Sequence, residues 1–183
     1  MRLILAIIAL TALTGMSRPP QDIPAPVDKP VEMCAHDCTI SKSGISMIIK
    51  HEGFSPVPYL DVAGLPTIGF GHLIKAGEEF TYLDPDQAAE LLRSDVDKFD
   101  RWLRRDVTVP LFYFQHDALV SLSFNVGRLR NTQTIGVVNS GDHERVPDWI
   151  MKWNKARVNG KLQPVRGLTN RRKDEARVYR EGH

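Results

Sequence analysis

The chain has 183 residues, of which 42% are hydrophobic and 25% are charged. This is about one domain of ordinary globular composition, which excludes wholesale disorder and fibrous repeats. The formal net charge of +2 is too small to indicate a nucleic-acid partner, and two cysteines are too few for a disulfide scaffold. Residues 41–100 carry five Lys and Arg against ten Asp and Glu, whereas residues 101–183 carry sixteen against eight. A basic C-terminal part beside an acidic middle indicates an anionic partner.

Residues 1–18 have the composition of an export signal. Residues 3–17 carry no charge and lie between Arg2 and Arg18. As a helix, this stretch would reach only about 22 Å, short of the roughly 30 Å hydrocarbon core of a bilayer. It is rich in small residues and threonine, which favours an export signal over a permanent anchor. A buried N-terminal helix is the alternative, which the proline-rich stretch that follows disfavours.

Residues 19–40 are predicted to be an extended, semi-rigid linker, because five of the twelve prolines fall between residues 19 and 30. Cys34 and Cys38 stand close together near its end. In an exported chain these two cysteines are expected to form a local disulfide. Free thiols are one alternative, and a metal site that also uses His36 and Asp37 is another. Zinc sites usually take a second ligand pair from elsewhere, and the sequence offers no such cluster.

From residue 41 to residue 183 the pattern predicts one α+β domain that is mostly helical. Ser41 or Ser43 can cap a first helix, whose apolar positions follow helical spacing at Ile45, Ile48 and Ile49. Gly53 is expected to end this helix. A small β-hairpin over residues 59–70 follows, with its turn at Ala63 and Gly64.

Helices dominate the remainder of the chain. Asp84, Pro85 and Gln87 stand at the N-cap, N1 and N3 positions of a long helix. A second helix is expected to begin within residues 108–110 and to end at Gly127. Shorter helices are expected over residues 132–139, 147–154 and 168–180. The first helix and hairpin would form a small lobe, the later helices a larger one, and a cleft would lie between them.

Glu52 is a carboxylic acid in an unusual position. It lies on the apolar face of the first helix, three residues after Ile49, and at the C-terminal end, where the helix dipole disfavours an anion. Burial and dipole would both favour the neutral acid, which a general acid needs near neutral pH. The alternative is a last-turn glutamate that reaches solvent.

Asp61 and Thr67 fall in the two halves of the predicted hairpin. A turn at Ala63 and Gly64 would bring them to facing positions, where a carboxylate and a hydroxyl could share one water molecule. Taken singly, Asp61 is a common turn residue and Thr67 a common strand residue. Together with Glu52 they supply an acid on one wall and a water-holding pair on the other. Cleavage of a glycosidic bond by direct water attack needs this arrangement.

The chain resembles the phage-type lysozymes of glycoside hydrolase family 24, which bacteriophages use as endolysins. The resemblance extends over about residues 43–180. It is carried by His-Glu-Gly at 51–53, Tyr-Leu-Asp at 59–61, Gly64, Thr-Ile-Gly-Phe-Gly-His at 67–72, Gln-His-Asp-Ala-Leu-Val at 115–120, Ser-Phe-Asn-Val-Gly at 123–127, Asn-Ser-Gly-Asp at 139–142 and Gly-Leu-Thr-Asn-Arg-Arg-Lys-Asp-Glu at 167–175.

The resemblance implies a lysozyme-like fold and hydrolysis of the β-1,4 bond between N-acetylmuramic acid and N-acetylglucosamine in bacterial peptidoglycan, which lyses the host cell. It implies that Glu52 is the acid and that Asp61 and Thr67 hold the water, with an inverting outcome. It also implies sugar-binding positions at Leu73, Phe124 and Thr134, although residues 132–138 depart from the family's usual Ser-Thr-Leu-Leu. No metal or cofactor is required, and a monomer is expected.

Two other functions stay open on the same scaffold. One is a wall-binding protein without turnover, since a fold does not guarantee a function. The other is a lytic transglycosylase, which would form an anhydro ring and would need no aspartate to activate water. A zinc site from His51, Glu52 and His72 is not supported, because the second histidine of His-Glu-x-x-His is missing. We expect His72 to be buried and hydrogen-bonded.

The N-terminal segment resembles that of signal-arrest-release endolysins. Residues 3–17 would hold the chain temporarily in the host inner membrane, facing the periplasm, and would then leave the bilayer to give a soluble periplasmic protein. A cleaved signal peptide is the alternative. Residues 145–183, with eleven Lys and Arg against four Asp and Glu, are either solvated helix surface or a surface that attracts anionic wall polymer.

Overall fold

The computed structural model describes residues 33–34, 38–61 and 63–183. The chain divides into two compact units, residues 1–30 and 31–183, and every described residue belongs to the second. The predicted export segment and most of the predicted linker lie outside the described residues. Among the helices that the structure describes, none combines the length and the apolarity that a membrane span requires.

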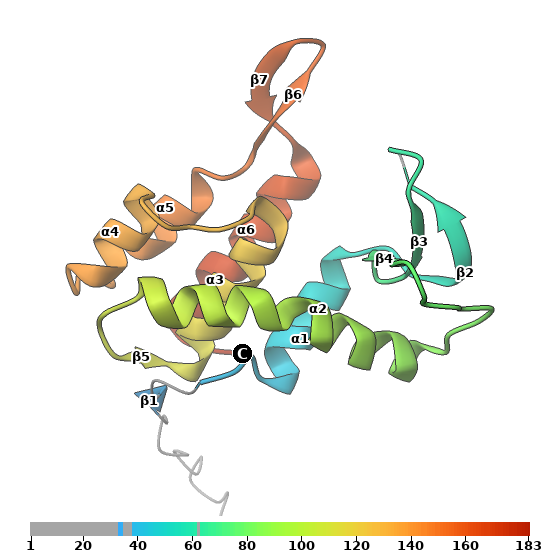
Figure 1. Cartoon of the computed structure of the whole chain (residues 1–183). Coiled ribbons are helices and arrows are strands. Elements are labelled where there is room, and N and C mark those ends of the chain that lie inside the picture. Colours follow the sequence, from blue (N-terminus) through green and yellow to red (C-terminus); the bar gives the residue numbers. More distant parts are fainter. Residues whose placement is uncertain (1–32, 35–37, 62) are drawn as a thin grey trace, which may run out of the picture. The chain divides into compact units, whose positions relative to one another are not determined.

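Helices and small antiparallel sheets make up the described residues, which confirms the expected mostly helical α+β class. The three sheets are β1–β5, β2–β3–β4 and β6–β7. Figure 1 shows the elements, which are β1 (Met33–Cys34), α1 (Lys42–His51), β2 (Ser55–Leu60), β3 (Pro66–Gly69), β4 (His72–Leu73), α2 (Pro85–Asp106), β5 (Leu111–Phe112), α3 (Tyr113–Val126), α4 (Gln133–Asn139), α5 (Val146–Met151), β6 (Lys155–Val158), β7 (Lys161–Pro164) and α6 (Arg166–Glu181).

Helix α3 is the centre of the fold. All residues from 115 to 123 are buried, because α1, α2 and α6 pack around the helix and leave it no solvent face. Helix α2 also contacts β3 and β4, so it joins the β2–β4 sheet to the helical part of the molecule (Figure 1). The predicted start of α3 within residues 108–110 is wrong. The helix begins at Tyr113, because Leu111 and Phe112 pair with β1 as a strand.

The predicted starts of α1 and α2 are confirmed. The hydroxyl oxygen of Ser41 accepts a hydrogen bond from the Gly44 N–H (3.1 Å), and Asp84 with Gln87 forms the expected capping box. The Ser41 hydroxyl also donates to Asp117 of α3 (2.5 Å), which ties the start of α1 to the central helix. At the other end of α1, Glu52 is the C-cap residue, and Gly53 follows it without a positive φ.

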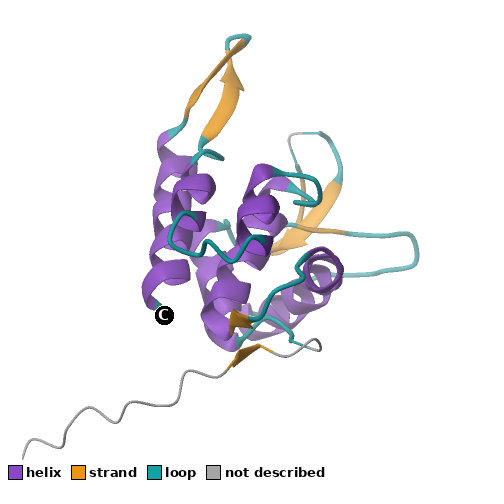
Figure 2. Ribbon diagram, turned by 90° about the vertical axis from the view of Figure 1, so that its left-hand side faces the viewer, coloured by secondary structure: helices purple, strands orange, loops and turns teal. Residues whose placement is uncertain are grey.

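The β6–β7 hairpin was not predicted. It projects away from the helices between α5 and α6 (Figures 1 and 2), and most of its residues are exposed. Asn159 and Gly160 form its turn with φ angles of 51° and 79°. Two successive residues with positive φ are what a tight hairpin turn requires, and Asn-Gly is the usual pair. That dipeptide was the signal from which the hairpin could have been found.

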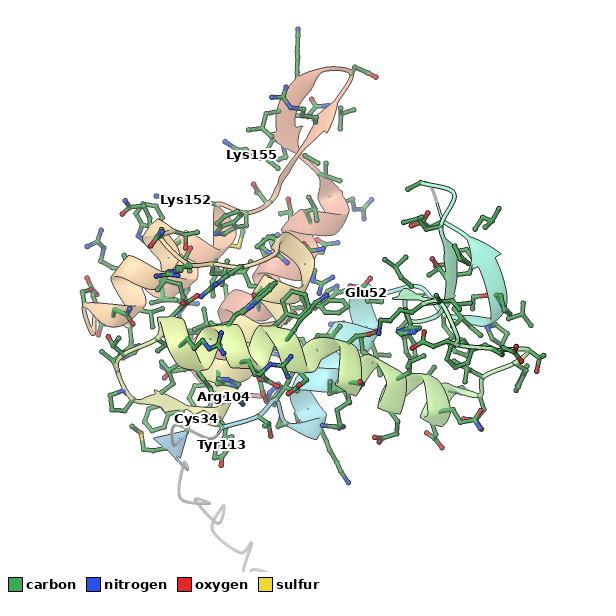
Figure 3. The ribbon with its side chains drawn as sticks, in the orientation of Figure 1. Cys34, Glu52, Arg104, Tyr113, Lys152 and Lys155 are labelled. Carbon is green, nitrogen blue, oxygen red and sulfur yellow. A yellow bond between two sulfur atoms is a disulfide. The ribbon has the colours of Figure 1, made fainter. Side chains whose placement is uncertain are left out.

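The predicted linker ends before residue 40. Met33 and Cys34 pair with β5, and Cys38 and Ile40 are buried in the core. The Sγ atoms of Cys34 and Cys38 are bonded in a disulfide (Figure 3). The backbone oxygen of Cys38 accepts a hydrogen bond from Arg104 of α2 (2.7 Å). The described residues of this segment therefore belong to the globular unit, because they contribute apolar side chains to the core and strand hydrogen bonds to β5.

Candidate active site

Glu52 lies where α1 leads into the β2–β4 sheet (Figure 3). Its backbone has left the helical conformation, at φ −101° and ψ 148°, while its N–H still donates to the Ile49 oxygen (3.2 Å). The side chain is 26% exposed. The expected apolar surroundings are therefore wrong, because the carboxylate reaches solvent on one side and meets a guanidinium on the other.

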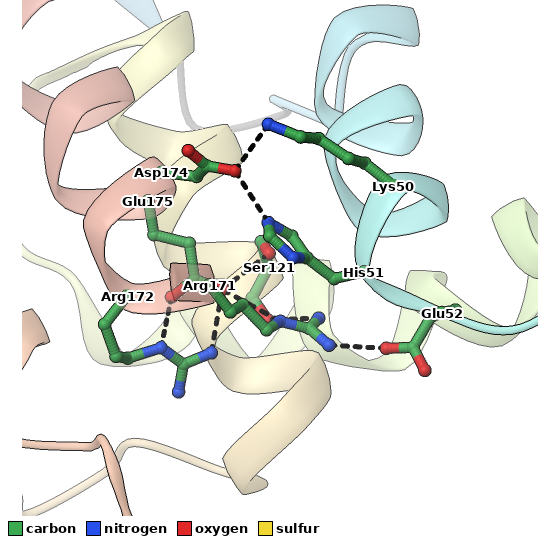
Figure 4. A network of polar contacts seen from close by, with 8 residues as sticks. All are labelled: Lys50, His51, Glu52, Ser121, Arg171, Arg172, Asp174 and Glu175. Carbon is green, nitrogen blue, oxygen red and sulfur yellow. Dashed lines mark hydrogen bonds and ion pairs between the residues drawn. The ribbon is translucent and has the colours of Figure 1, made fainter. Parts of the chain in front are cut away.

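That guanidinium belongs to Arg171 of α6, which is 119 residues away in the sequence and 3% exposed. Its Nη1 donates to Glu52 Oε1 at 2.5 Å. Figure 4 shows the second carboxylate oxygen of Glu52 pointing away from Arg171. The ion pair therefore fixes one oxygen of Glu52 and leaves the other turned outward.

Arg171 is held by further buried groups. Its Nε donates to Glu175 Oε1 (3.2 Å), and its Nη2 donates to the backbone oxygen of Ser121 (3.3 Å). Glu175 is completely buried and is also paired with Arg172 (2.7 Å) and hydrogen-bonded by the Ser121 hydroxyl (2.8 Å). Desolvation raises the pKa of Glu175, although both arginines and Ser121 oppose this shift. Desolvation also lowers the pKa of Arg172.

The sequence reasoning gave no role to Arg171, Arg172 or Glu175. Their spacing carried a signal, because residues three and four apart on a helix are neighbours and can pair. The contact between Glu52 and Arg171 carried no such signal, since the two residues are far apart in the sequence. The buried ion network therefore holds the side chain of Glu52 through Arg171.

A second bridge joins the last turn of α1 to α6. Asp174 Oδ2 lies 2.7 Å from Lys50 Nζ and 3.0 Å from His51 Nε2. Burial, and next the charge of Arg171, lower the pKa of His51, while Asp174 opposes the shift. The residue before Glu52 is thus anchored to the same helix as Arg171, so the backbone and the side chain of Glu52 are both fixed by α6.

Asp61 lies at the turn between β2 and β3. Its Oδ1 accepts hydrogen bonds from the backbone N–H groups of Ala63 and Leu65, both at 2.8 Å. Its own N–H donates to the Leu65 oxygen (2.9 Å), and its backbone oxygen accepts from Gly64, whose φ is +77°. The turn itself therefore orients the carboxylate, as is common for aspartate in such positions.

Thr67 does not lie directly opposite Asp61, as had been expected. It pairs with Tyr59 across the β2–β3 ladder, and Asp61 is two residues further along. Asp61 follows Leu60, the last residue of β2, so it lies just beyond the ladder and diagonal to Thr67. Such pairs are about 7–8 Å apart in a regular ladder. Thr67 is buried, and its hydroxyl donates to the Leu65 oxygen (3.1 Å).

The three positions suggested for sugar binding have different surroundings. Leu73 is 47% exposed and pairs with Thr67 in the β3–β4 ladder, so it shares the face of the sheet that carries Thr67. Phe124 is half-buried, with its ring 5.5 Å from that of Phe99. Thr134 is 1% exposed, and its hydroxyl accepts a hydrogen bond from Trp153 (3.0 Å). Thr134 is therefore held by a buried hydrogen bond, and its sugar contact stays a prediction.

His72 has the structural role that was expected of it. It is 3% exposed, and its two ring nitrogens lie 2.8 Å from Asp95 and 2.9 Å from Glu78. These bonds tie β4 to α2 and to the loop before it. No step of a glycosidase reaction is needed to explain His72.

The family model described as Phage lysozyme matches residues 49–175. The chain belongs to the phage lysozyme family. It is 35% identical to the endolysin of Acyrthosiphon pisum secondary endosymbiont phage 1, over 76% of this chain and 97% of that protein. It is 30% identical to the SAR-endolysin of Pseudomonas phage phiKMV, over 73% and 83% of the two chains.

The solved structure of the endolysin from Escherichia coli O157:H7 phage FAHEc1 superposes with a TM-score of 0.72. That structure is 31% identical and covers 80% of this chain and 96% of its own. The resemblance and the lysozyme-like fold are thus confirmed. As a phage lysozyme, the chain is a muramidase that hydrolyses peptidoglycan and acts in host cell lysis. The matched region contains Glu52, Asp61, Thr67 and the arginine–glutamate network of α6.

Proposed function

We propose that the chain cleaves the β-1,4 bond between N-acetylmuramic acid and N-acetylglucosamine with Glu52 as the general acid. The Glu52–Arg171 contact is the observation that carries this assignment. A carboxyl group with one oxygen fixed by a buried guanidinium and the other turned outward is oriented toward a ligand. Orientation of this kind lets a positioned acid transfer its proton without first losing rotational freedom.

In the proposed reaction, Glu52 gives its proton to the glycosidic oxygen as the bond to the anomeric carbon breaks. A water molecule attacks that carbon from the opposite face, and Asp61 takes the proton which the water loses. Asp61 Oδ1 is occupied by two backbone N–H groups, so Oδ2 is the oxygen that accepts this proton. The Thr67 hydroxyl donates to Leu65, so its oxygen accepts the second hydrogen of the water. Attack opposite the leaving oxygen inverts the anomeric configuration.

Mass spectrometry of digested cell wall separates this reaction from its two alternatives. Hydrolysis leaves reducing muramic acid ends, a transglycosylase leaves anhydro ends, and a wall-binding protein leaves no fragments. Glu52→Gln should remove the fragments, while Glu79→Gln, the same change at an exposed position, should leave them. Anhydro ends, or fragments made by Glu52→Gln, would refute the assignment. NMR of the first product should show the inverted anomer, and a retained anomer would contradict the role given to Asp61.

We also propose that the chain is exported and acts as a monomer in the periplasm, after residues 3–17 have held it temporarily in the host inner membrane. Similarity to a SAR-endolysin supports this proposal. The mass of the soluble periplasmic protein tests it, since full length indicates release and a start near Gly15 or Arg18 indicates cleavage. Replacing Thr11, Thr14 and Gly15 with leucine should trap the chain in the membrane and delay lysis, because it makes the segment more apolar. Unchanged membrane association and unchanged lysis timing would refute release.

The basic C-terminal part is proposed to attract anionic wall polymer. The segment from residue 152 to residue 166 carries five cations and no carboxylate, and most of it is the exposed β6–β7 hairpin. Figure 3 labels Lys152 and Lys155 at the base of this hairpin. Attraction between exposed charges is screened by salt. Lys155→Glu with Lys161→Glu should therefore weaken wall binding at low salt and have little effect at 1 M salt.

A further inference from the structure

Three potential metal ligands converge beside β1, away from Glu52 and the β2–β3 hairpin. The Sγ atoms of Cys34 and Cys38 and a ring nitrogen of His116 all lie within 4.8 Å of one another. Cys38 is 4% exposed and His116 is 3% exposed. The two cysteines come from the first described residues and the histidine from α3, so the cluster joins the N-terminal segment to the central helix (Figure 3 labels Cys34).

His116 lacks the hydrogen bonds that a buried imidazole normally makes. Among the described residues, neither of its ring nitrogens has a hydrogen-bond partner. A carboxylate oxygen, Asp100 Oδ1, lies 3.5 Å from Nε2, and that carboxylate already accepts from the Ile40 N–H (3.2 Å). His72 and His143, by contrast, are hydrogen-bonded. Buried polar groups without partners are rare, so His116 is free to bind something else.

The cluster borders a hollow that can admit an ion and its water. A cavity of about 320 Å³ is lined by Cys34, Cys38 and His116, together with residues of the α2–α3 connection. Arg104 also lines it, and this cation would stabilise the negative charge of two thiolates. The cavity therefore supplies room and ligands.

We propose that reduction of the Cys34–Cys38 disulfide converts this cluster into a zinc site with two thiolates and the His116 imidazole as ligands. A dithiol reductant supplies two electrons and two protons, so that it becomes a disulfide while the S–S bond becomes two thiols. Zn²⁺ then displaces the two thiol protons and binds both sulfurs and the imidazole nitrogen. Three protein ligands and one water complete a tetrahedral site.

Zinc would need its three ligand atoms at a defined spacing. Zn–S bonds of about 2.3 Å and Zn–N bonds of about 2.0–2.1 Å place tetrahedral ligand atoms roughly 3.5–3.8 Å apart. A ring nitrogen of His116 already lies within 4.8 Å of both sulfurs. The two sulfurs are bonded to each other in the disulfide, so after reduction they must move apart to reach this spacing. His36 and Asp37, the other ligands considered from the sequence, lie outside the described residues, and the site does not use them. Zinc would hold β1 to α3 wherever thiols stay reduced.

Cobalt binding to the full-length chain tests the proposal. With a phosphine reductant present, Co²⁺ should bind one ion per chain and give thiolate-to-metal charge-transfer absorption, which Zn²⁺ then removes. The chain has no other cysteine, so this absorption reports the pair alone. The oxidised chain should show none. A reduced chain that gives no such absorption, or an oxidised chain that gives the same one, would overturn the proposal.

Matched variants test the ligands individually. Cys34→Ser and Cys38→Ser should each remove most of the charge-transfer band, and His116→Gln should weaken Co²⁺ binding at least tenfold. His143→Gln, which alters a histidine between α4 and α5 that is hydrogen-bonded to Tyr179, should leave binding unchanged. Zinc K-edge absorption of the unmodified reduced chain should show two sulfur neighbours and one imidazole. This measurement needs no variant to fold, and a shell without imidazole would exclude His116 as a ligand.

Discussion

Glu52 and the Asp61–Thr67 pair are held in place by two different kinds of contact. The Glu52 side chain depends on α6, through an arginine 119 residues away and a completely buried glutamate behind it. Asp61 and Thr67 depend on backbone groups between residues 61 and 67. Glu52 is therefore positioned by the tertiary fold, and Asp61 and Thr67 by one local turn.

This difference predicts how each half should respond to substitution. A change at Asp61 should alter the chemistry and leave the global stability nearly unchanged, because its contacts are confined to the turn. Changes in the α6 network should reduce stability and activity together. A buried charge that loses its partner is strongly destabilising, whereas an exposed turn is not.

The largest expected effect is on catalysis by Glu52→Gln. The amide oxygen can still accept from Arg171, so the fold should persist, but the side chain has no proton to give. General acids typically contribute about 10²–10⁴-fold to the rate. Initial rates of wall lysis should fall by at least this factor while the melting temperature stays within a few degrees. A variant with near wild-type activity would show that Glu52 is not the acid.

Asp61→Asn should reduce the lysis rate by about 10²–10⁴-fold, the usual contribution of a general base. Its amide oxygen can keep the bonds from Ala63 and Leu65, so the turn should persist. Thr67→Ala should cost roughly tenfold, since one hydrogen bond to water is lost. Denaturant unfolding should show little change for Asp61→Asn. A large loss of stability would mean that the local turn is coupled to the core.

Glu175→Ala tests the ion network of α6 that holds Arg171. It leaves Arg171 and Arg172 buried without their shared carboxylate, and breaking a buried pair costs about 3–5 kcal/mol. The free energy of unfolding, measured in urea, should fall by this amount. Lys173→Ala, an exposed change on the same helix, should have little effect. Equal effects of the two substitutions would contradict the importance given to the network.

The smallest expected effect is a pH dependence that arises from His51. Its pKa is lowered in the folded protein by burial and by Arg171, while Asp174 opposes and Lys50 assists the shift. The folded state therefore favours the neutral ring, and stability should be lost as the pH falls below the unfolded pKa of about 6.5. His51→Gln should flatten this part of the stability profile. An unchanged slope between pH 7 and pH 5 would contradict the assignment.

Much of the local structure was predictable from short-range signals. Ser41 and the capping box at Asp84 fixed two helix starts, and Gly64 marked the β2–β3 turn. The turn at Asn159 and Gly160 carried an equally clear signal, which was overlooked because the surrounding residues are exposed and give no core pattern. These features depend on φ preferences and on nearby hydrogen bonds, which a sequence displays directly.

The sequence by itself determined which residues could serve as the acid, the base and the water-holding hydroxyl, because those properties belong to the side chains and their spacing. Only the tertiary structure decided that Arg171 meets Glu52, that Thr67 pairs with Tyr59, and that β1 shortens α3 by pairing with residues 111–112. Each of these contacts joins segments that nothing local brings together. Burying a charge or the edge of a strand is costly unless it finds a partner. The folded core supplies these partners from distant parts of the chain.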